Sequence, residues 1–77
     1  MNKENLIYYL THKEVLGMTK IPKSSLPRYI LEEGFPASVD GTTRVNFWVL
    51  SEVQAWMQSR IDKRDQKIAE KKLEIHL

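Results

Sequence analysis

The side chains with the clearest capacity for chemistry are three cations and two hydroxyls close together in the first half of the chain. Positions 20–31 carry a net charge of +3 and contain no acidic residue. Ammonium and guanidinium groups bind phosphates, and hydroxyls can donate to phosphate oxygens or base edges. This combination favours contact with a nucleic-acid duplex. The candidate residues are Lys20, Lys23, Ser24, Ser25 and Arg28.

Each candidate has more than one reading. Arg28 can donate two hydrogen bonds to a guanine edge, which discriminates sequence by about 1–3 kcal/mol. It can equally grip a phosphate or remain a solvated surface arginine. Lys20 and Lys23 fit phosphate contact better than base reading. Ser24 is open between DNA contact and capping a helix.

A short helix must position these groups. Apolar Leu26, Tyr29 and Ile30 recur at three- and four-residue spacings and predict one buried face. Gly34 is the expected left-handed C-cap, and Pro36 forbids continuation. One face can therefore be buried while another shows positive charge, as in a helix that enters a DNA major groove.

The start of this helix has two possible placements. Pro22 can be its first residue, after Ile21. Alternatively, Ser24 is the N-cap and Pro27 lies in the first turn, where its missing amide has no helical partner. We favour the second placement, because the first puts Pro27 deep enough to cost about 3 kcal/mol. The helix is then expected over about 25–33.

A second short helix is predicted just before this segment. Thr11 is a good N-cap, and Glu14 completes a capping box with it. The helix is expected over about 12–18, with Val15 and Leu16 facing inward. Two turns are too short to persist without tertiary packing, so this helix must dock on a core.

Residues 37–48 predict a β-hairpin whose turn is Asp40-Gly41. Alternation along its second half puts Phe47 on one face and Trp48 on the other. A small hairpin after two helices indicates a wing whose loop can contact the DNA backbone or enter a minor groove. The candidate contacts there are Thr42, Thr43 and Arg44.

A third helix is expected after Ser51, which is a suitable N-cap. Val53, Trp56 and Met57 form its inward stripe. Beyond that stripe the chain becomes charged, and residues 61–77 read as a helix-prone tail attached to a domain over residues 1–60. The tail can be a solvated helix face, a further phosphate contact, a dimer contact or a docking segment for an integrase.

Composition narrows the class of protein. The 77 residues make one small domain without cysteine, so a thiolate metal site or disulfide is excluded. Residues 1–59 have no net charge and residues 60–77 have +2, so a local patch rather than bulk charge would meet nucleic acid. No apolar run is long enough for a membrane span, and residues 1–8 read as a loose polar leader, so we expect a soluble cytoplasmic protein.

The chain lacks the usual signatures of catalysis and metal binding. His12 and His76 are the only histidines and lie far apart, and no Gly-rich phosphate loop or nucleophile elbow occurs. We expect no bound metal, no cofactor and no enzyme activity. A domain this small needs large side chains in its core. The aromatic residues expected there are Tyr29, Phe35, Phe47, Trp48 and Trp56.

Four short motifs occur in a familiar order and resemble the AlpA-type phage regulators, which are small MerR-like winged-helix proteins. They are Lys13-Glu14-Val15, Gly34-Phe35-Pro36, Trp48 and Ser51-Glu52-Val53-Gln54-Ala55-Trp56. The resemblance covers about residues 10–57. It implies an α+β, mostly helical fold: a small winged helix-turn-helix with a two-stranded wing and a C-terminal helix.

The resemblance also implies a function. Members bind double-stranded DNA without enzymatic activity, as regulators of integrase genes or as excisionases, which bend attachment-site DNA and direct an integrase towards excision. By matching positions, Lys23, Ser24, Ser25 and Arg28 fall on the recognition helix and Arg44 on the wing. An integrase and neighbouring copies along DNA are the implied protein partners. The chain differs from the pattern at Lys20, where glycine is common, and at Pro22 and Pro27.

A different class of function stays open beside this one. The near-neutral body and the long C-terminal helix would also suit a protein–protein adaptor on a winged-helix scaffold. Its docking residues would be Leu73, Ile75 and Leu77.

Overall fold

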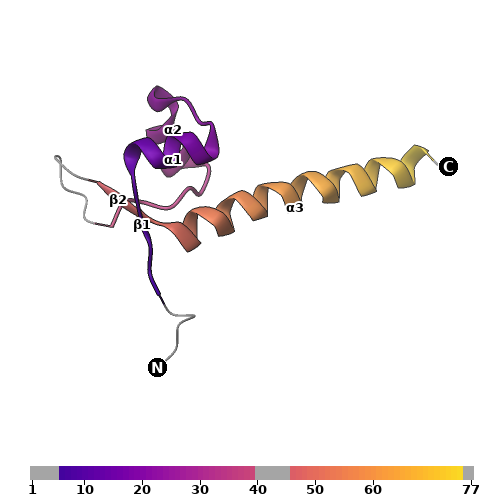
Figure 1. The fold of residues 1–77 in the computed structure, drawn as a ribbon. Helices are drawn as coiled ribbons and strands as arrows, with labels where there is room; N and C mark the ends of the chain where they lie inside the picture. Colours follow the sequence, from indigo (N-terminus) through magenta and orange to yellow (C-terminus); the bar gives the residue numbers. More distant parts are fainter. Residues whose placement is uncertain (1–5, 40–45, 76–77) are drawn as a thin grey trace.

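The computed structural model describes residues 6–39 and 46–75. Within them the order is a short strand β1 (Tyr9–Thr11), helix α1 (His12–Thr19), a 3-10 turn η2 (Lys23–Ser25), helix α2 (Leu26–Glu32), strand β2 (Phe47–Val49) and a long helix α3 (Leu50–Ile75). Figure 1 shows α1 and α2 close to the two strands, and α3 running away from them. The fold is small, mostly helical and α+β, as predicted.

Helix α1 begins as the sequence predicted. The Thr11 hydroxyl accepts from the Glu14 amide at 3.2 Å, and the Glu14 carboxylate accepts from the Thr11 amide at 2.8 Å. This reciprocal pair confirms the capping box. The helix ends at Lys20, which has a left-handed backbone with φ of 64° and donates its amide to Leu16 O at 2.9 Å. A left-handed lysine carries a steric cost that a glycine would not.

The start of α2 agrees with the favoured placement only in part, and Pro22 is not the first helical residue because it precedes η2 with an extended backbone. Pro27 lies in the first turn of the helix, as expected. The prediction that Ser24 is the N-cap is wrong, because Ser24 lies inside η2 and no side-chain cap bond occurs at either start. The turn leads directly into α2 through backbone bonds such as Ser25 N–H to Pro22 O at 2.9 Å, so a side-chain cap is not needed. Gly34, with φ of 76°, confirms the predicted left-handed end.

The two-stranded sheet pairs differently from the prediction. Strand β2 is antiparallel to β1, with Leu10 opposite Trp48, whereas residues 34–39 form no strand. Among the residues that the structure describes, the predicted hairpin partner contributes one backbone bond, from Val39 N–H to Phe47 O at 2.7 Å. The pairing of β1 with β2 is stabilised by the stacked rings of Tyr9 and Phe47, whose centroids are 5.6 Å apart. Strand β1 also leads directly into α1. The residues just after the predicted leader, Tyr9–Thr11, therefore supply half of the sheet, and no strand was predicted there.

One apolar cluster joins every element except η2. Its buried members are Val15, Ile21, Leu26, Phe35, Trp48 and Val53. Half-buried side chains predicted to face inward pack around them, including Tyr29, Trp56 and Met57. Trp48 is buried, and Phe47 is half-buried, so alternation placed the two on opposite faces correctly, with Trp48 on the core side.

The segment after α2 is fastened to the rest of the core by two indoles. Trp48 Nε1 donates to Pro36 O at 2.9 Å, and Trp56 Nε1 donates to Glu33 O at 3.0 Å. Trp56 and Phe35 also form a T-shaped pair, with 4.9 Å between their ring centroids. The C-terminal end of α2 is therefore held against the first turns of α3.

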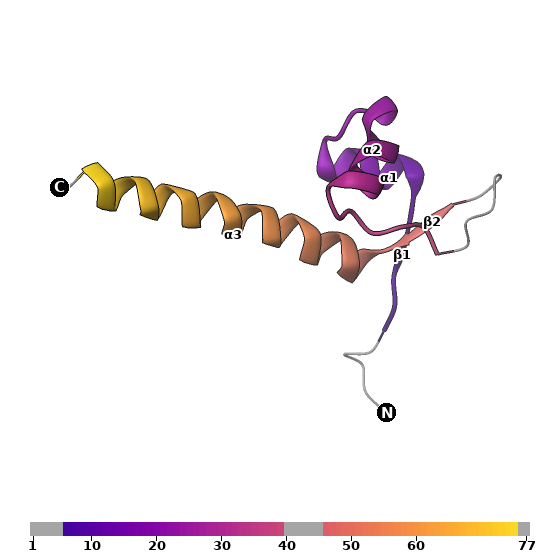
Figure 2. The same cartoon turned by 180° about the vertical axis from the view of Figure 1, so that it is seen from behind.

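Helix α3 is one unbroken element of 26 residues. At 1.5 Å per residue it is about 39 Å long. Every side chain described beyond position 57 is exposed, and Figures 1 and 2 both show this part of α3 projecting away from the other elements. The helix passes the expected domain boundary at residue 60 without a break. None of the helices that the structure describes has the length and apolar character needed to cross a bilayer.

Candidate nucleic-acid interface

The predicted cations of the first half of the chain lie at the surface. Lys20, Lys23 and Ser24 are exposed, Ser25 is half-buried, and the Arg28 side chain is 52% exposed. Lys20 closes α1, the next two belong to η2, and Arg28 lies in α2. The turn between the helices and the first part of α2 therefore offers positive charge and a hydroxyl to solvent.

Helix α2 has two faces of different character. Leu26 is buried and Ile30 is half-buried on the core side. Arg28 and Leu31 are three residues apart, which makes them neighbours on the opposite side of the helix. Leu31 is 83% exposed. A cation beside an exposed apolar side chain matches the guanine edge and the thymine methyl that a major groove presents.

Leu31 was not selected by sequence reasoning. Its helical spacing from Arg28 was available as a signal, but an isolated leucine next to an apolar stripe reads as part of the core. The structure gives it the greatest exposure of the large apolar residues in the described part of the chain.

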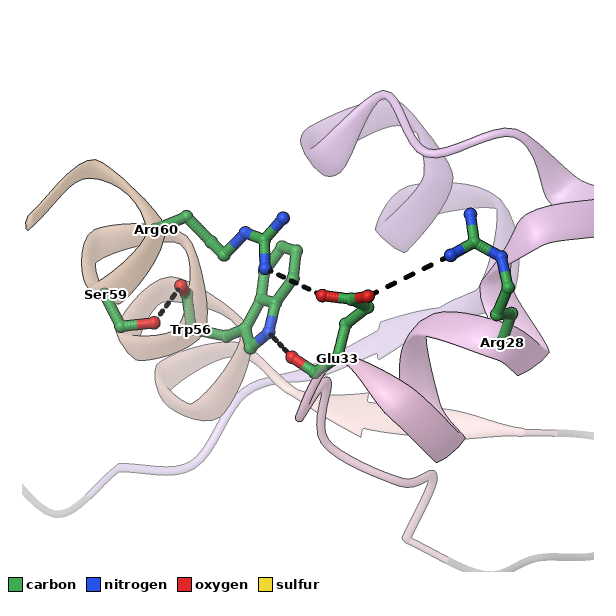
Figure 3. Close-up of polar contacts among 5 residues, drawn as sticks. All are labelled: Arg28, Glu33, Trp56, Ser59 and Arg60. Carbon is green, nitrogen blue, oxygen red and sulfur yellow. Dashed lines mark hydrogen bonds and ion pairs between the residues drawn. The ribbon is translucent and has the colours of Figure 1, made fainter. Parts of the chain in front are cut away.

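Arg28 is close to an acid of its own chain. Its Nη1 lies 4.0 Å from Glu33 Oε2, and its guanidinium lies 5.0 Å from the centre of the Tyr29 ring. Arg60 of α3 makes the shorter contact to the same carboxylate, from Nη1 to Oε1 at 3.2 Å. Figure 3 shows the Glu33 carboxylate between the two arginines. Glu33 therefore joins the exposed cation of α2 to the first exposed cation of α3.

These ion pairs are weak enough to be replaced by a phosphate. Arg28 and Arg60 keep 52% and 42% of their side-chain area exposed, and Glu33 keeps 35%. Exposed pairs contribute about 0–1 kcal/mol because water screens them and ordering long side chains costs entropy. Arg28 is thus oriented by Glu33 without being neutralised in a buried pair.

Sequence reasoning missed the role of Glu33 and Arg60. They are 27 positions apart, so no local pattern shows their contact. The predicted wing contacts Thr42, Thr43 and Arg44 lie outside the residues that the structure describes. Among the described residues, no group of three or more His, Cys, Asp or Glu side chains could hold a metal ion.

The arrangement defines a small α+β protein that presents the cations of a short helix, and the turn before it, on one compact core. The model of a family described as prophage CP4-57 regulatory protein (AlpA) matches residues 9–61, more than half of the chain. The chain belongs to this family of prophage regulatory proteins. No curated protein and no solved structure matched it. The family match begins with β1 and ends within α3.

Proposed function

We propose that this protein binds double-stranded DNA of a prophage or integrative element, as an excisionase or as a regulator of the element's integrase gene. In this proposal α1, η2 and α2 act as a helix-turn-helix with α2 as the recognition helix. The loop that contains Arg44 acts as the wing. The observation that carries the proposal is the exposed face of α2, where Arg28 and Leu31 stand opposite the buried side, in a family of prophage regulators.

The proposed contacts divide into two kinds. Lys20 and Lys23 suit phosphates beside the groove, because they are exposed point charges near the N-terminal end of α2. Arg28 and Leu31 suit base edges, because they project from the side of α2 that faces away from the core. With Ser24, Ser25 and the wing residues Thr42, Thr43 and Arg44, about 4–6 phosphate contacts are expected, which gives a slope of log affinity on log salt near −4 to −5.

A single copy should bind weakly. A module of this size covers only about 600–1,000 Å² of DNA-contact surface. Tight binding would therefore need adjacent copies along the DNA, which suits an assembly that bends its site. Footprinting on the element's attachment sites and integrase promoter, followed by an excision assay and an integrase transcription assay, separates the excisionase role from the regulatory one.

The decisive substitutions are at Arg28, measured by fluorescence anisotropy on a footprinted duplex. Arg28→Lys keeps the charge but loses the planar pair of donors. If Arg28 reads a base, this change should weaken the specific site by about 1–3 kcal/mol and leave random-sequence DNA almost unaffected. If it grips a phosphate, Arg28→Lys should bind like the wild type and Arg28→Ala should weaken both DNAs equally.

A matched pair of lysines controls for charge alone. Lys23→Gln and Lys13→Gln each remove one exposed cation, but Lys13 lies on α1 outside the proposed surface. The first should reduce the salt slope by about 0.9 and the second should not. Wild-type protein that shows no salt-dependent binding to element DNA would refute the proposed function.

A protein–protein adaptor is the second candidate, favoured by the exposed outer half of α3. Ile61, Ile68 and Leu73 are 42%, 45% and 69% exposed. Truncation after Arg60 separates the two candidates. An adaptor should keep its DNA affinity and lose the partner, whereas a protein that binds DNA through α3 as well should lose affinity.

A further inference from the structure

Five cations lie along one side of the outer half of α3. They are Arg60, Lys63, Arg64, Lys67 and Lys71, here called the α3 cation row, and they line a single open groove together with Glu33 and Ile68. Their spacings of three and four residues place them on one side of a helix. Glu33 is the only acid among the residues that line this groove.

None of the α3 acids whose side chains the structure describes lines the groove, although one of them, Asp65, pairs with Arg64 of the row. Asp62 and Asp65 do not line the groove. Asp62 accepts a hydrogen bond from Gln58 at 3.0 Å, and Asp65 pairs with Arg64 at 2.8 Å. Among the side chains that the structure describes, Lys63, Lys67 and Lys71 form no ion pair within 4.0 Å. The groove therefore has a clear excess of positive charge.

The spacing of the row matches the charge density of a duplex. From Arg60 to Lys71 the helix rises about 16 Å, which gives one cation per roughly 4 Å. One strand of B-DNA carries a phosphate per about 3.4 Å of helix axis. The row and one DNA strand thus carry opposite charge at similar densities along their axes, so the row can neutralise nearby phosphates without ordering a flexible chain first.

The row begins where the surface of α2 ends. Arg60 and Arg28 contact the two oxygens of the same Glu33 carboxylate, at 3.2 and 4.0 Å, as Figure 3 shows. The bond from Trp56 Nε1 to Glu33 O fixes this junction. Phosphates that approach Arg28 are therefore also close to the first member of the row.

We propose that the α3 cation row binds the sugar-phosphate backbone of the same duplex that α2 engages, beyond the recognition site. This inference rests on the proposed function. Lys63, Arg64, Lys67 and Lys71 lie after the last residue that the family model matches. The row contributes affinity and fixes the path of the DNA along α3, and it carries no base specificity because it contacts only the backbone.

A matched pair of lysines on one helix tests the proposal. Lys67 belongs to the row, whereas Lys72 is exposed on the same helix and does not line the groove. In full-length protein, Lys67→Gln should reduce the slope of log affinity on log salt by about 0.9 and weaken specific and random duplexes equally. Lys72→Gln, with the same loss of charge, should leave the slope near its wild-type value.

A triple change extends the test. Replacing Lys63, Lys67 and Lys71 together by Gln should reduce the slope by roughly 2–3, with the far-ultraviolet circular dichroism of the helices unchanged. If the wild type and the Lys23→Gln control behave as the proposed function requires, but Lys67→Gln and Lys72→Gln give equal slopes, this inference is overturned alone. A triple variant that keeps full DNA affinity and loses an acidic protein partner also overturns it. Wild-type protein that binds no DNA removes the inference and the proposed function together.

Discussion

At the scale of single residues, Glu33 competes with the DNA that the surface is proposed to bind. Its carboxylate accepts from Arg60 at 3.2 Å and lies 4.0 Å from Arg28. A phosphate that approaches Arg28 must displace this acid or tolerate its repulsion. Glu33 should therefore lower the affinity for all DNA sequences. Binding should stay strongest at sites where the other residues of the surface also make their contacts.

Glu33→Gln is expected to tighten binding to random-sequence duplexes several-fold at low salt, because it removes a negative charge between two proposed phosphate ligands. Its effect on the free energy of unfolding should stay within about 1 kcal/mol, as the ion pairs are exposed. Anisotropy titrations and thermal unfolding measure both quantities.

Glu32→Gln is the matched control for this change. Glu32 is the adjacent residue, is exposed, and forms no ion pair within 4.0 Å in the part of the chain that the structure describes. Equal gains in affinity from both variants would show that only net charge matters and that the position of Glu33 does not.

Lys20 combines a proposed phosphate contact with an unfavourable backbone. Its φ of 64° suits glycine. Lys20→Gly should raise the free energy of unfolding by roughly 0.5–1 kcal/mol, which is a few degrees in Tm for a domain of this size. The same change should weaken DNA binding, since it removes a cation. Calorimetry should thus show a higher Tm, and anisotropy should show a lower affinity for DNA.

Lys20→Ala separates the two effects. Alanine loses the same charge but keeps the Cβ that makes the left-handed backbone costly. It should weaken DNA binding as much as Lys20→Gly does, with little or no gain in Tm. A gain in Tm as large as that of the glycine variant would contradict the strain argument.

At the scale of elements, the packing of α2 against α3 depends on the Trp56 indole. The N–H group of Trp56 donates to Glu33 O at 3.0 Å, and its ring makes T-shaped contacts with Tyr29 and Phe35. The hydrogen bond fixes the end of the proposed recognition helix, while the ring contacts fill the space beneath it.

Trp56→Phe removes that hydrogen bond and keeps an aromatic ring in the core. It should lower the free energy of unfolding by about 1 kcal/mol, or more where the smaller ring leaves space. Hydrogen exchange at the last amides of α2 should accelerate beyond the global change. Exchange that accelerates uniformly across the molecule would show that Trp56 serves general stability and does not hold α2 in particular.

Local elements could be predicted from sequence because their signals are local. The capping box of Thr11 and Glu14 and the left-handed Gly34 are patterns within four residues, and the structure confirms both. Strand β1 could not be predicted this way. Tyr9 pairs with Val49, forty positions away, and three residues carry too little alternation to reveal a strand.

At the scale of the whole molecule, part of the candidate surface could be predicted because it depends on local sequence patterns. The exposure of Lys20, Lys23 and Arg28 follows from the periodicity of their apolar neighbours. The contact between Glu33 and Arg60 depends on how α2 packs on α3, which only the tertiary structure shows. The wing contacts expected at Thr42, Thr43 and Arg44 lie outside the described residues and remain a prediction.

The unbroken course of α3 has a consequence for how length changes in this chain would act. Each added residue turns the rest of an α-helix by about 100°. One residue inserted between Trp56 and Arg60 would therefore swing every later cation around the helix axis and away from α2, with no charge lost. An insertion close to a whole turn would restore the phase. Relatives can be compared in which the C-terminal helix is longer or shorter. Whether the cations of that helix lie on the same side as α2 should depend on their angular position around the helix axis more than on the number of lysines.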